Sequence, residues 1–171
     1  MSQRNRTSKT VLLQAQQPAA AKPKPRPPAI PPMVDEKYGP ADGIMALPRE
    51  KLIAILGDAG ASVYAKAKAC QALGMKGEEA AVPALAALLP DPQLSHYARY
   101  GLEPMPGPAA DEALRAALGK VKGKLLAGVI NSIGCRRDKQ AIEALGKLVD
   151  DAGLEVARAA GDALARIRPM L

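Results

Sequence analysis

The chain has 171 residues, a formal net charge of +7 and 48% hydrophobic residues, but only 2% aromatic residues, with no Phe and no Trp. Its hydrophobic residues are mostly Ala and Leu, whereas β-sandwich and barrel cores favour β-branched and aromatic side chains, so we expect an all-α fold without strands. The charge lies mainly at the amino terminus: residues 1–34 hold six basic residues and no acidic one, and residues 35–171 hold 18 basic and 17 acidic residues. Because a domain that binds nucleic acid usually carries a basic face, this near-neutral balance predicts no nucleic-acid partner.

Residues 1–38 are predicted to form a disordered, basic, Pro/Ala-rich tail or linker. The stretch "QQPAAAKPKPRPPAIPPM" has few side chains to bury, and its prolines favour an extended polyproline conformation. It contains PxxP spacings, such as Pro28 to Pro31. A ligand for an SH3-type domain is therefore an alternative to a plain linker.

The amino terminus also bears on the compartment. Its basic start is followed only by the apolar run "VLL", which is shorter than the roughly 7–15 apolar residues of a secretory signal. No stretch is long enough to span a membrane, so the sequence as written predicts a cytoplasmic protein. The segment "LLQAQQPAAA" would suit the end of a signal sequence, and an exported protein whose true start lies upstream is the alternative.

Residues 39–171 are predicted to form one helical domain. Apolar residues recur in them at three- and four-residue spacing, which is typical of amphipathic helices. The spacing predicts helices near residues 48–57, 63–74, 80–89, 93–104, 109–119, 124–134, 138–149 and 153–168.

Prolines and glycines mark the expected helix ends. Pro48, Pro83 and Pro108 fall in the first turn of a predicted helix, where a missing backbone N–H costs nothing. Gly74 and Gly134 are expected to end helices in the left-handed conformation.

The predicted helices repeat along the chain. The stretch "GMKGEEAAVPALAALLPD", which begins at Gly74, aligns its apolar positions with those of "GCRRDKQAIEALGKLVDD", which begins at Gly134. Between the two, "ADEALRAAL" (residues 110–118) shows the same pattern at an offset of 29 residues from the first. A period of about 30 residues predicts a stack of four helix pairs.

One part of this repeat resembles a known family. The stretch "EEAAVPALAALLPDPQLSHYARYGLE" resembles the short HEAT-like repeat named after phycobilisome lyases. The longer run "LSHYARYGLEPMPGPAADEALRAALGK…GVINSIGCRRD" is similar to HEAT-repeat proteins of planctomycete-type bacteria, and the resemblance covers about residues 47–168. It implies a right-handed α-solenoid whose second helices line the concave surface. It implies little about function, because this repeat serves many unrelated proteins.

The second helix of each pair carries a candidate binding surface. These helices align on residues that we expect to be buried: Leu73, Leu102, Ile133 and Leu164. Two residues earlier stand polar or amphipathic residues, which we call the ladder: Gln71, Tyr100, Asn131 and Asp162. Tyr97 lies beside Tyr100, and an exposed tyrosine pair suits a protein-binding hot spot. Plain solvent exposure of a non-core register is the alternative.

Basic residues cluster in two predicted turns. Lys122 and Lys124 lie before the helix near 124–134, and Arg136 and Arg137 follow it. They are candidate anion contacts for an acidic partner or a phosphate. The alternative is that they are solvated cations at helix ends.

No catalytic or metal site is predicted, and no cofactor is expected. His96 is the only histidine, and a zinc site needs three or four ligands, so a structural or surface role is expected for it. Cys70 and Cys135 lie two repeats apart, too far for a disulfide, and we expect a small core residue and a surface thiol.

The sequence therefore predicts a non-catalytic protein-binding scaffold or adaptor, with a protein partner held on the second helices. The resemblance leaves a bilin lyase-like chaperone or attachment factor as one alternative. A nucleic-acid-binding HEAT-like protein is the other.

Overall fold

The computed structural model describes residues 33–168, which are mainly helical. In this range two short strands, β1 (Val34–Asp35) and β2 (Gly39–Pro40), precede the helices α1 (Ala41–Met45), α2 (Arg49–Gly57), α3 (Val63–Lys76), α4 (Val82–Ala86), α5 (Ser95–Leu102), α6 (Ala109–Ala117), α7 (Gly123–Arg136), α8 (Ile142–Leu148) and α9 (Leu154–Ile167). The 3₁₀ turns η1 (Glu79–Ala81) and η2 (Lys139–Ala141) directly precede α4 and α8. The proline-rich stretch of the predicted tail, including its PxxP spacing, lies outside the described residues.

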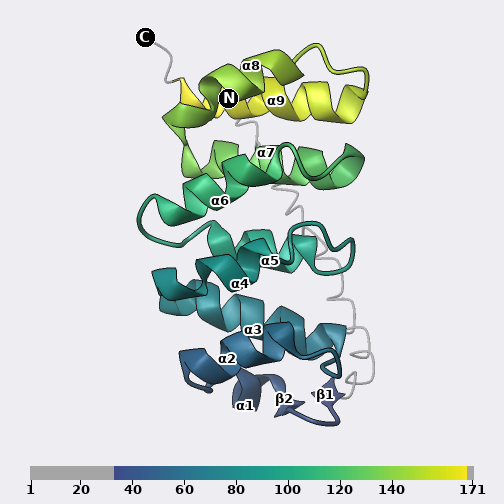
Figure 1. The fold of residues 1–171 in the computed structure, drawn as a ribbon, viewed down its shortest axis with the longest axis vertical. Coiled ribbons are helices and arrows are strands. Elements are labelled where there is room, and N and C mark those ends of the chain that lie inside the picture. Colours follow the sequence, from purple (N-terminus) through teal and green to yellow (C-terminus); the bar gives the residue numbers. More distant parts are fainter. Residues whose placement is uncertain (1–32, 169–171) are drawn as a thin grey trace, which may run out of the picture. The chain divides into compact units, whose positions relative to one another are not determined.

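Each predicted helical segment contains a helix in the structure, which confirms that the described part of the chain is mainly helical. The helices follow one another in chain order from α1 to α9 (Figure 1). The helices from α2 onward pack in successive pairs: α2 on α3, α4 on α5, α6 on α7, and α8 on α9. Helices that are two apart in the chain also pack on each other. In this way α3 packs on α5 and α7 on α9, while α4 packs on both α2 and α6. None of the helices in residues 33–168 has the length and apolar character needed to cross a membrane.

The predicted buried stripe of the second helices is largely confirmed. Leu73, Leu102 and Ile133 are completely buried, whereas Leu164 is only half-buried. In α9 the core positions are instead Ala163 and Ile167, which flank Leu164 on the helix. The end of the α9 stripe is therefore rotated relative to the sequence alignment.

The prediction that Gly74 and Gly134 end their helices is wrong. Both helices continue for two more residues, and the left-handed residues that end them are Gly77 (φ 65°) and Arg137 (φ 56°). Gly74 instead lets two helices approach closely, because a Cβ added there would lie 2.8 Å from the Cα of Gly101 in α5. At Gly134 the added Cβ would lie 2.9 Å from the Cα of a residue in α9. A side chain at either position would therefore force neighbouring backbones apart.

The prolines also differ in detail from their predicted places. Pro48 and Pro108 precede α2 and α6 as N-cap residues, and Pro83 is the second residue of α4. All three positions tolerate proline, because the N–H groups there have no partner within the helix.

A small hairpin at the amino-terminal end was not predicted, since the composition argued against strands. β1 and β2 pair antiparallel, with Asp35 opposite Gly39. The buried Asp35 carboxylate accepts hydrogen bonds from the backbone N–H groups of Lys37 and Tyr38 and from the Ser62 hydroxyl. Asp35 therefore ties the hairpin to the start of α3.

Asp58 holds the other side of the same hairpin. Its carboxylate accepts hydrogen bonds from Lys37 Nζ (2.6 Å), Tyr38 Oη (2.5 Å) and the Gly60 N–H (2.9 Å). The bonds from Lys37, Tyr38 and Gly60 hold the pKa of Asp58 well below its usual range. The Ser62 hydroxyl, with the two backbone N–H groups, lowers the pKa of Asp35 in the same way, against the effect of burial.

Candidate functional site

The ladder residues are accessible, but the structure does not gather them into one site. Tyr100 is 51% exposed and Tyr97 is 39% exposed, both in α5. Asp162 in α9 is exposed, whereas Gln71 and Asn131 are half-buried. Tyr100 lines one hollow, while Asn131 and Asp162 line another, and Gln71 lines neither.

The first hollow lies between α3 and α5, and we call it the α3–α5 hollow. Its volume is about 570 Å³, and it is lined by Tyr100 and Pro104 together with Met75, which is 70% exposed. Met75 was not predicted from the sequence. It stands four residues after Gln71, so the two side chains share one face of α3, and this spacing was the available signal.

The second hollow lies between α7 and α9, and we call it the α7–α9 groove. Its volume is about 880 Å³. The charged or amide side chains that line it are Arg99 of α5, Lys124 and Asn131 of α7, and Glu155, Arg158 and Asp162 of α9. The small residues Gly128 and Ala159 also line it. Lys124 was predicted as an anion contact and Asn131 as a ladder residue, and the structure brings the two together.

Arg99 occupies a position that is apolar in the neighbouring repeats. The corresponding residues are Cys70 in α3 and Ile130 in α7, and both are completely buried. Arg99 instead reaches across to α7, where its Nη1 donates to the carbonyl of Gly128 (3.1 Å) and to the hydroxyl of Ser132 (3.3 Å). Burial lowers the pKa of Arg99, while the nearby charge of Glu103 opposes this shift.

Gly128 is required for this arrangement. A Cβ added at Gly128 would lie 2.8 Å from the Cζ of Arg99, inside van der Waals contact. The sequence analysis missed Arg99. A basic residue at an apolar register, with a glycine in the facing helix, was the available signal.

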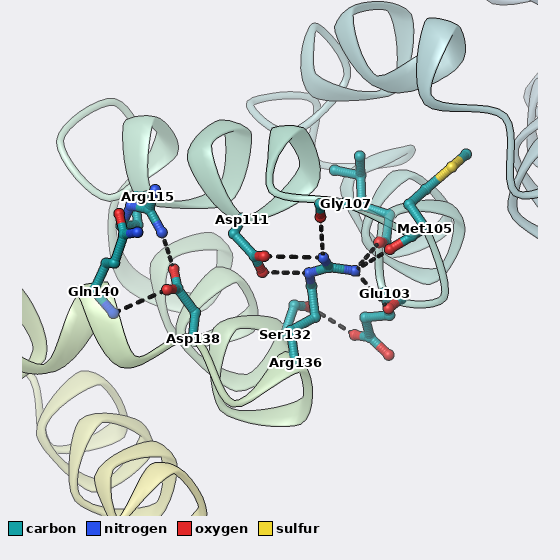
Figure 2. Close-up of polar contacts among 10 residues, drawn as sticks. Glu103, Met105, Gly107, Asp111, Arg115, Ser132, Arg136, Asp138 and Gln140 are labelled. Atoms are coloured by element: carbon teal, nitrogen blue, oxygen red, sulfur yellow. Dashed lines mark hydrogen bonds and ion pairs between the residues drawn. The ribbon is translucent and has the colours of Figure 1, made fainter.

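Arg136 is held inside the protein, as Figure 2 shows. Its Nε and Nη2 donate to the Asp111 carboxylate, at 2.5 Å and 3.1 Å. The remaining donors bind the backbone carbonyls of Leu102, Glu103, Met105 and Gly107, at 2.7–3.1 Å. Arg136 therefore satisfies the carbonyls that follow the end of α5 and fixes the start of α6.

This arrangement corrects the sequence-based role of Arg136. The side chain of Arg136 is only 9% exposed, and all five N–H donors of its guanidinium have acceptors within the protein. Arg136 thus belongs to an internal network and not to the groups open to an external anion. The other candidate anion contacts, Lys122, Lys124 and Arg137, are exposed, with the two lysines at the start of α7 and Arg137 just after its end.

Further polar contacts join α5 and α6 to α7 and η2. The Ser132 hydroxyl donates to Glu103 Oε1 (2.7 Å), and Arg115 pairs with the buried Asp138, whose carboxylate also accepts from the backbone N–H of Gln140 (Figure 2). We call the network of Arg99, Glu103, Asp111, Ser132 and Arg136 the α5–α7 seam.

His96 and the two cysteines lie apart from the hollows. His96 is exposed, and its ring meets that of Tyr97 edge-on, with centroids 5.5 Å apart. Cys70 is a free, buried thiol, and burial raises its pKa to about 12. Cys135 is a free, exposed thiol. Within residues 33–168 no three His, Cys, Asp or Glu side chains lie close enough together to hold a metal ion.

No protein-family model matches the chain, and no curated protein sequence matches it.

Proposed function

We propose that residues 39–171 form a right-handed α-solenoid of HEAT-like helix pairs, and that this solenoid is a non-catalytic protein-binding scaffold. Two features support the architecture. The sequence period of about 30 residues coincides with the alternation of the helices, and α3 and α7 each pack on the next helix but one. On this view the exposed face of α3, α5, α7 and α9 is the concave surface.

The observation that carries the proposal is the exposed apolar cluster of Met75, Tyr97 and Tyr100 on α3 and α5. The chain has four tyrosines and neither Phe nor Trp, so two of its few aromatic side chains are placed where solvent reaches them. Tyrosine and methionine are enriched at protein interfaces, because each buries a large apolar area against a partner. We infer that an apolar side chain of the partner enters the α3–α5 hollow between Met75 and Tyr100.

The two hollows differ in the kind of contact that they offer a partner. The α3–α5 hollow offers apolar area, whereas the α7–α9 groove offers charged groups. A partner segment that crosses α5 and α7 would meet an apolar anchor point first and a polar contact next. Such a combination of a buried anchor and a polar surround is the usual anatomy of a protein interface.

Affinity capture with matched variants tests the proposal. The full chain serves as bait in a lysate of the source cells, and a Tyr97→Ala/Tyr100→Ala variant is run beside it. A Val149→Ala variant is the control, because Val149 is also an exposed apolar side chain (37%) but follows α8 and lines neither hollow. Retained proteins are then purified and their dissociation constants measured.

We expect at least one retained protein whose affinity falls about tenfold or more in the tyrosine variant and is unchanged in the control. Equal retention by all three baits, or no retained protein at all, would contradict the proposal. Circular dichroism of each bait shows that a lost interaction does not come from a lost fold.

A further inference from the structure

The α7–α9 groove contains charged side chains that have no ionic partner among residues 33–168. Lys124, Glu155, Arg158 and Asp162 are exposed and form no ion pair there, although other charged residues in this range are paired. Ionic groups that face each other across a groove without pairing are available to a charged ligand.

Arg99 provides a second observation at the same place. Its Nε is buried and has no hydrogen-bond partner among the described residues, and only its Nη1 donates to the protein. A guanidinium has five donors and no acceptor, and buried polar groups usually find a partner. Arg136 shows what a satisfied arginine looks like in this protein, since all its donors are used. The Nη2 of Arg99, like its Nε, has no hydrogen-bond partner among the described residues but is not buried, so the donors of Nη2 remain for an acceptor that these residues do not supply.

The helix spacing sets these groups in two opposing walls. On α7, Lys124 and Asn131 stand four residues before and three residues after Gly128, against which the Arg99 guanidinium lies. On α9, Glu155 and Asp162 stand seven residues apart, on one face of the helix. The α7 wall thus offers an ammonium and an amide group, and the α9 wall offers the two carboxylates together with the guanidinium of Arg158.

The balance of charge favours an acidic ligand group. The groove has three cations, which are Arg99, Lys124 and Arg158, and two carboxylates. Arg158 lies on α9 between the two carboxylates in sequence, so a bound acidic group has cations on both α7 and α9. Hydrogen bonds between a guanidinium and a carboxylate are charge-assisted and strong, so the Nη2 group of Arg99 is a suitable partner for this acidic group.

We propose that the α7–α9 groove binds a segment of a protein partner in which an acidic side chain pairs with Arg99 and Lys124, and a neighbouring basic side chain pairs with Glu155 and Asp162. This inference rests on the proposed protein-binding function and specifies the chemistry of the bound segment. Leu154 lines the groove and is 82% exposed, and it offers apolar contact to the aliphatic parts of those side chains.

Selection from a peptide library tests the inference without knowledge of the natural partner. The probe is a phage-displayed library of random peptides of about 12 residues, selected on the immobilised full chain. Enriched peptides are synthesised with a fluorophore, and their dissociation constants are measured by fluorescence anisotropy. Versions in which each acidic residue is replaced by its amide are measured beside them.

Two charge reversals in the groove are compared with two matched reversals outside it. Lys124→Glu is paired with Lys139→Glu, and Glu155→Lys is paired with Glu112→Lys. All four residues are exposed and form no ion pair in the described part of the chain, so the fold should tolerate each change. Circular dichroism checks this.

We expect enriched peptides that carry both an acidic and a basic residue. Their affinity should fall about tenfold or more in Lys124→Glu and on removal of the acidic charge, and by a smaller factor in Glu155→Lys. The matched reversals at Lys139 and Glu112 should change it less than about twofold.

Three results would overturn the inference: no enriched peptide, enriched peptides without acidic residues, or equal effects of Lys124→Glu and Lys139→Glu. The Tyr97→Ala/Tyr100→Ala variant separates this failure from failure of the scaffold proposal. Peptides whose affinity depends on the tyrosines but not on Lys124 would support the scaffold proposal and contradict the proposed role of the groove. Peptides whose affinity depends on neither the tyrosines nor Lys124 would contradict both proposals.

Discussion

The α3–α5 and α7–α9 junctions are made by small residues, whereas the α5–α7 junction is made by charged ones. At the first two, Gly74 faces Gly101 and Gly134 faces Ala163 at distances that leave no space for a larger side chain. At the third, the guanidinium of Arg99 lies against Gly128 and is joined by the other residues of the α5–α7 seam. Helices at equivalent positions of the sequence repeat are thus held together by two different kinds of interaction.

The difference teaches which changes each junction tolerates. A junction of close backbones has no spare volume, so added atoms destabilise it. Its stability does not depend on charged side chains. A junction of buried polar groups depends on every donor having its acceptor, so the loss of one partner leaves the others unpaired. The stability of variants at Arg136, Gly74 and Arg99 separates these two kinds of junction.

The largest effect is expected from Arg136→Met, which removes the central donor of the α5–α7 seam. The substitution keeps an extended side chain but leaves Asp111 and several backbone carbonyls without their partner. Loss of one partner of a buried charged pair costs about 3–5 kcal/mol, so the free energy of unfolding in urea should fall by that amount. Lys139→Met at an exposed site is the control, and a loss no larger than that of the control would show that the seam is not stabilising.

Gly74→Ala is expected to destabilise the α3–α5 junction. The new Cβ would lie 2.8 Å from the Cα of Gly101, so the two helices must separate, at a cost of about 1–3 kcal/mol. Gly161→Ala in α9 is the matched control, because an added Cβ there meets no atom within 4 Å. Thermal unfolding should show Gly161→Ala to be more stable by about 0.5–1 kcal/mol, from helix propensity alone. If both changes stabilise the protein, the close approach does not exist in solution.

Arg99→Met is expected to change stability by less than about 1 kcal/mol, in contrast to Arg136→Met. Arg99 makes only two hydrogen bonds to the protein, and apolar residues occupy its register in α3 and α7. Arg99 forms no ion pair in residues 33–168, so its substitution leaves no buried countercharge unpaired, and the loss of two hydrogen bonds is opposed by removal of the desolvation cost of the charge. Chemical unfolding of the two variants side by side measures the contrast, and equal losses would mean that Arg99 is as integral to the seam as Arg136.

Acid is expected to weaken the amino-terminal hairpin, which belongs to neither kind of junction. The pKa values of Asp35 and Asp58 lie below their usual value of 3.8, because hydrogen bonds from Ser62 and Lys37, respectively, favour the charged forms. In acid the folded protein therefore binds fewer protons than the unfolded chain. The stability that the charged carboxylates contribute is complete above about pH 5 and is lost as the pH falls through 3.8 and below.

Amide hydrogen exchange at Tyr38, followed from about pH 6 to about pH 3 and corrected for the intrinsic rate, measures this loss. Asp58→Asn should lower the protection at the higher pH and reduce its dependence on acid. Protection that is independent of pH in both proteins would show that the two carboxylates do not hold the hairpin.

Much of the helical framework was readable from the sequence. The three- and four-residue spacing of Leu and Ala predicted the helical segments and the buried Leu73, Leu102 and Ile133, because a helix turns through a fixed angle per residue and local sequence records it. The ladder positions followed from the same register, and Tyr100 and Asp162 are indeed exposed.

The candidate site was readable only in part. Register placed Asn131 and Asp162 at equivalent positions, but it did not show that Arg99 would reach α7 or that Met75 would border Tyr100. Long side chains contact residues of neighbouring helices, and the sequence pattern does not specify which ones. Their partners therefore depend on how closely the helices approach.

The sequence by itself determined the helical segments from α2 to α9, most of their buried positions and which residues repeat, because these follow from periodicity within a single element. Only the tertiary structure decided that Gly74 and Gly134 are contact points and not helix ends, that Arg136 is internal, and that Arg99 faces a groove with donors to spare. The physical reason is that these roles are properties of the space between helices. Whether a glycine ends a helix or allows a second helix to approach depends on which backbone lies within a few ångströms of it. Whether the donors of an arginine have acceptors within the protein depends on its neighbours in the same way.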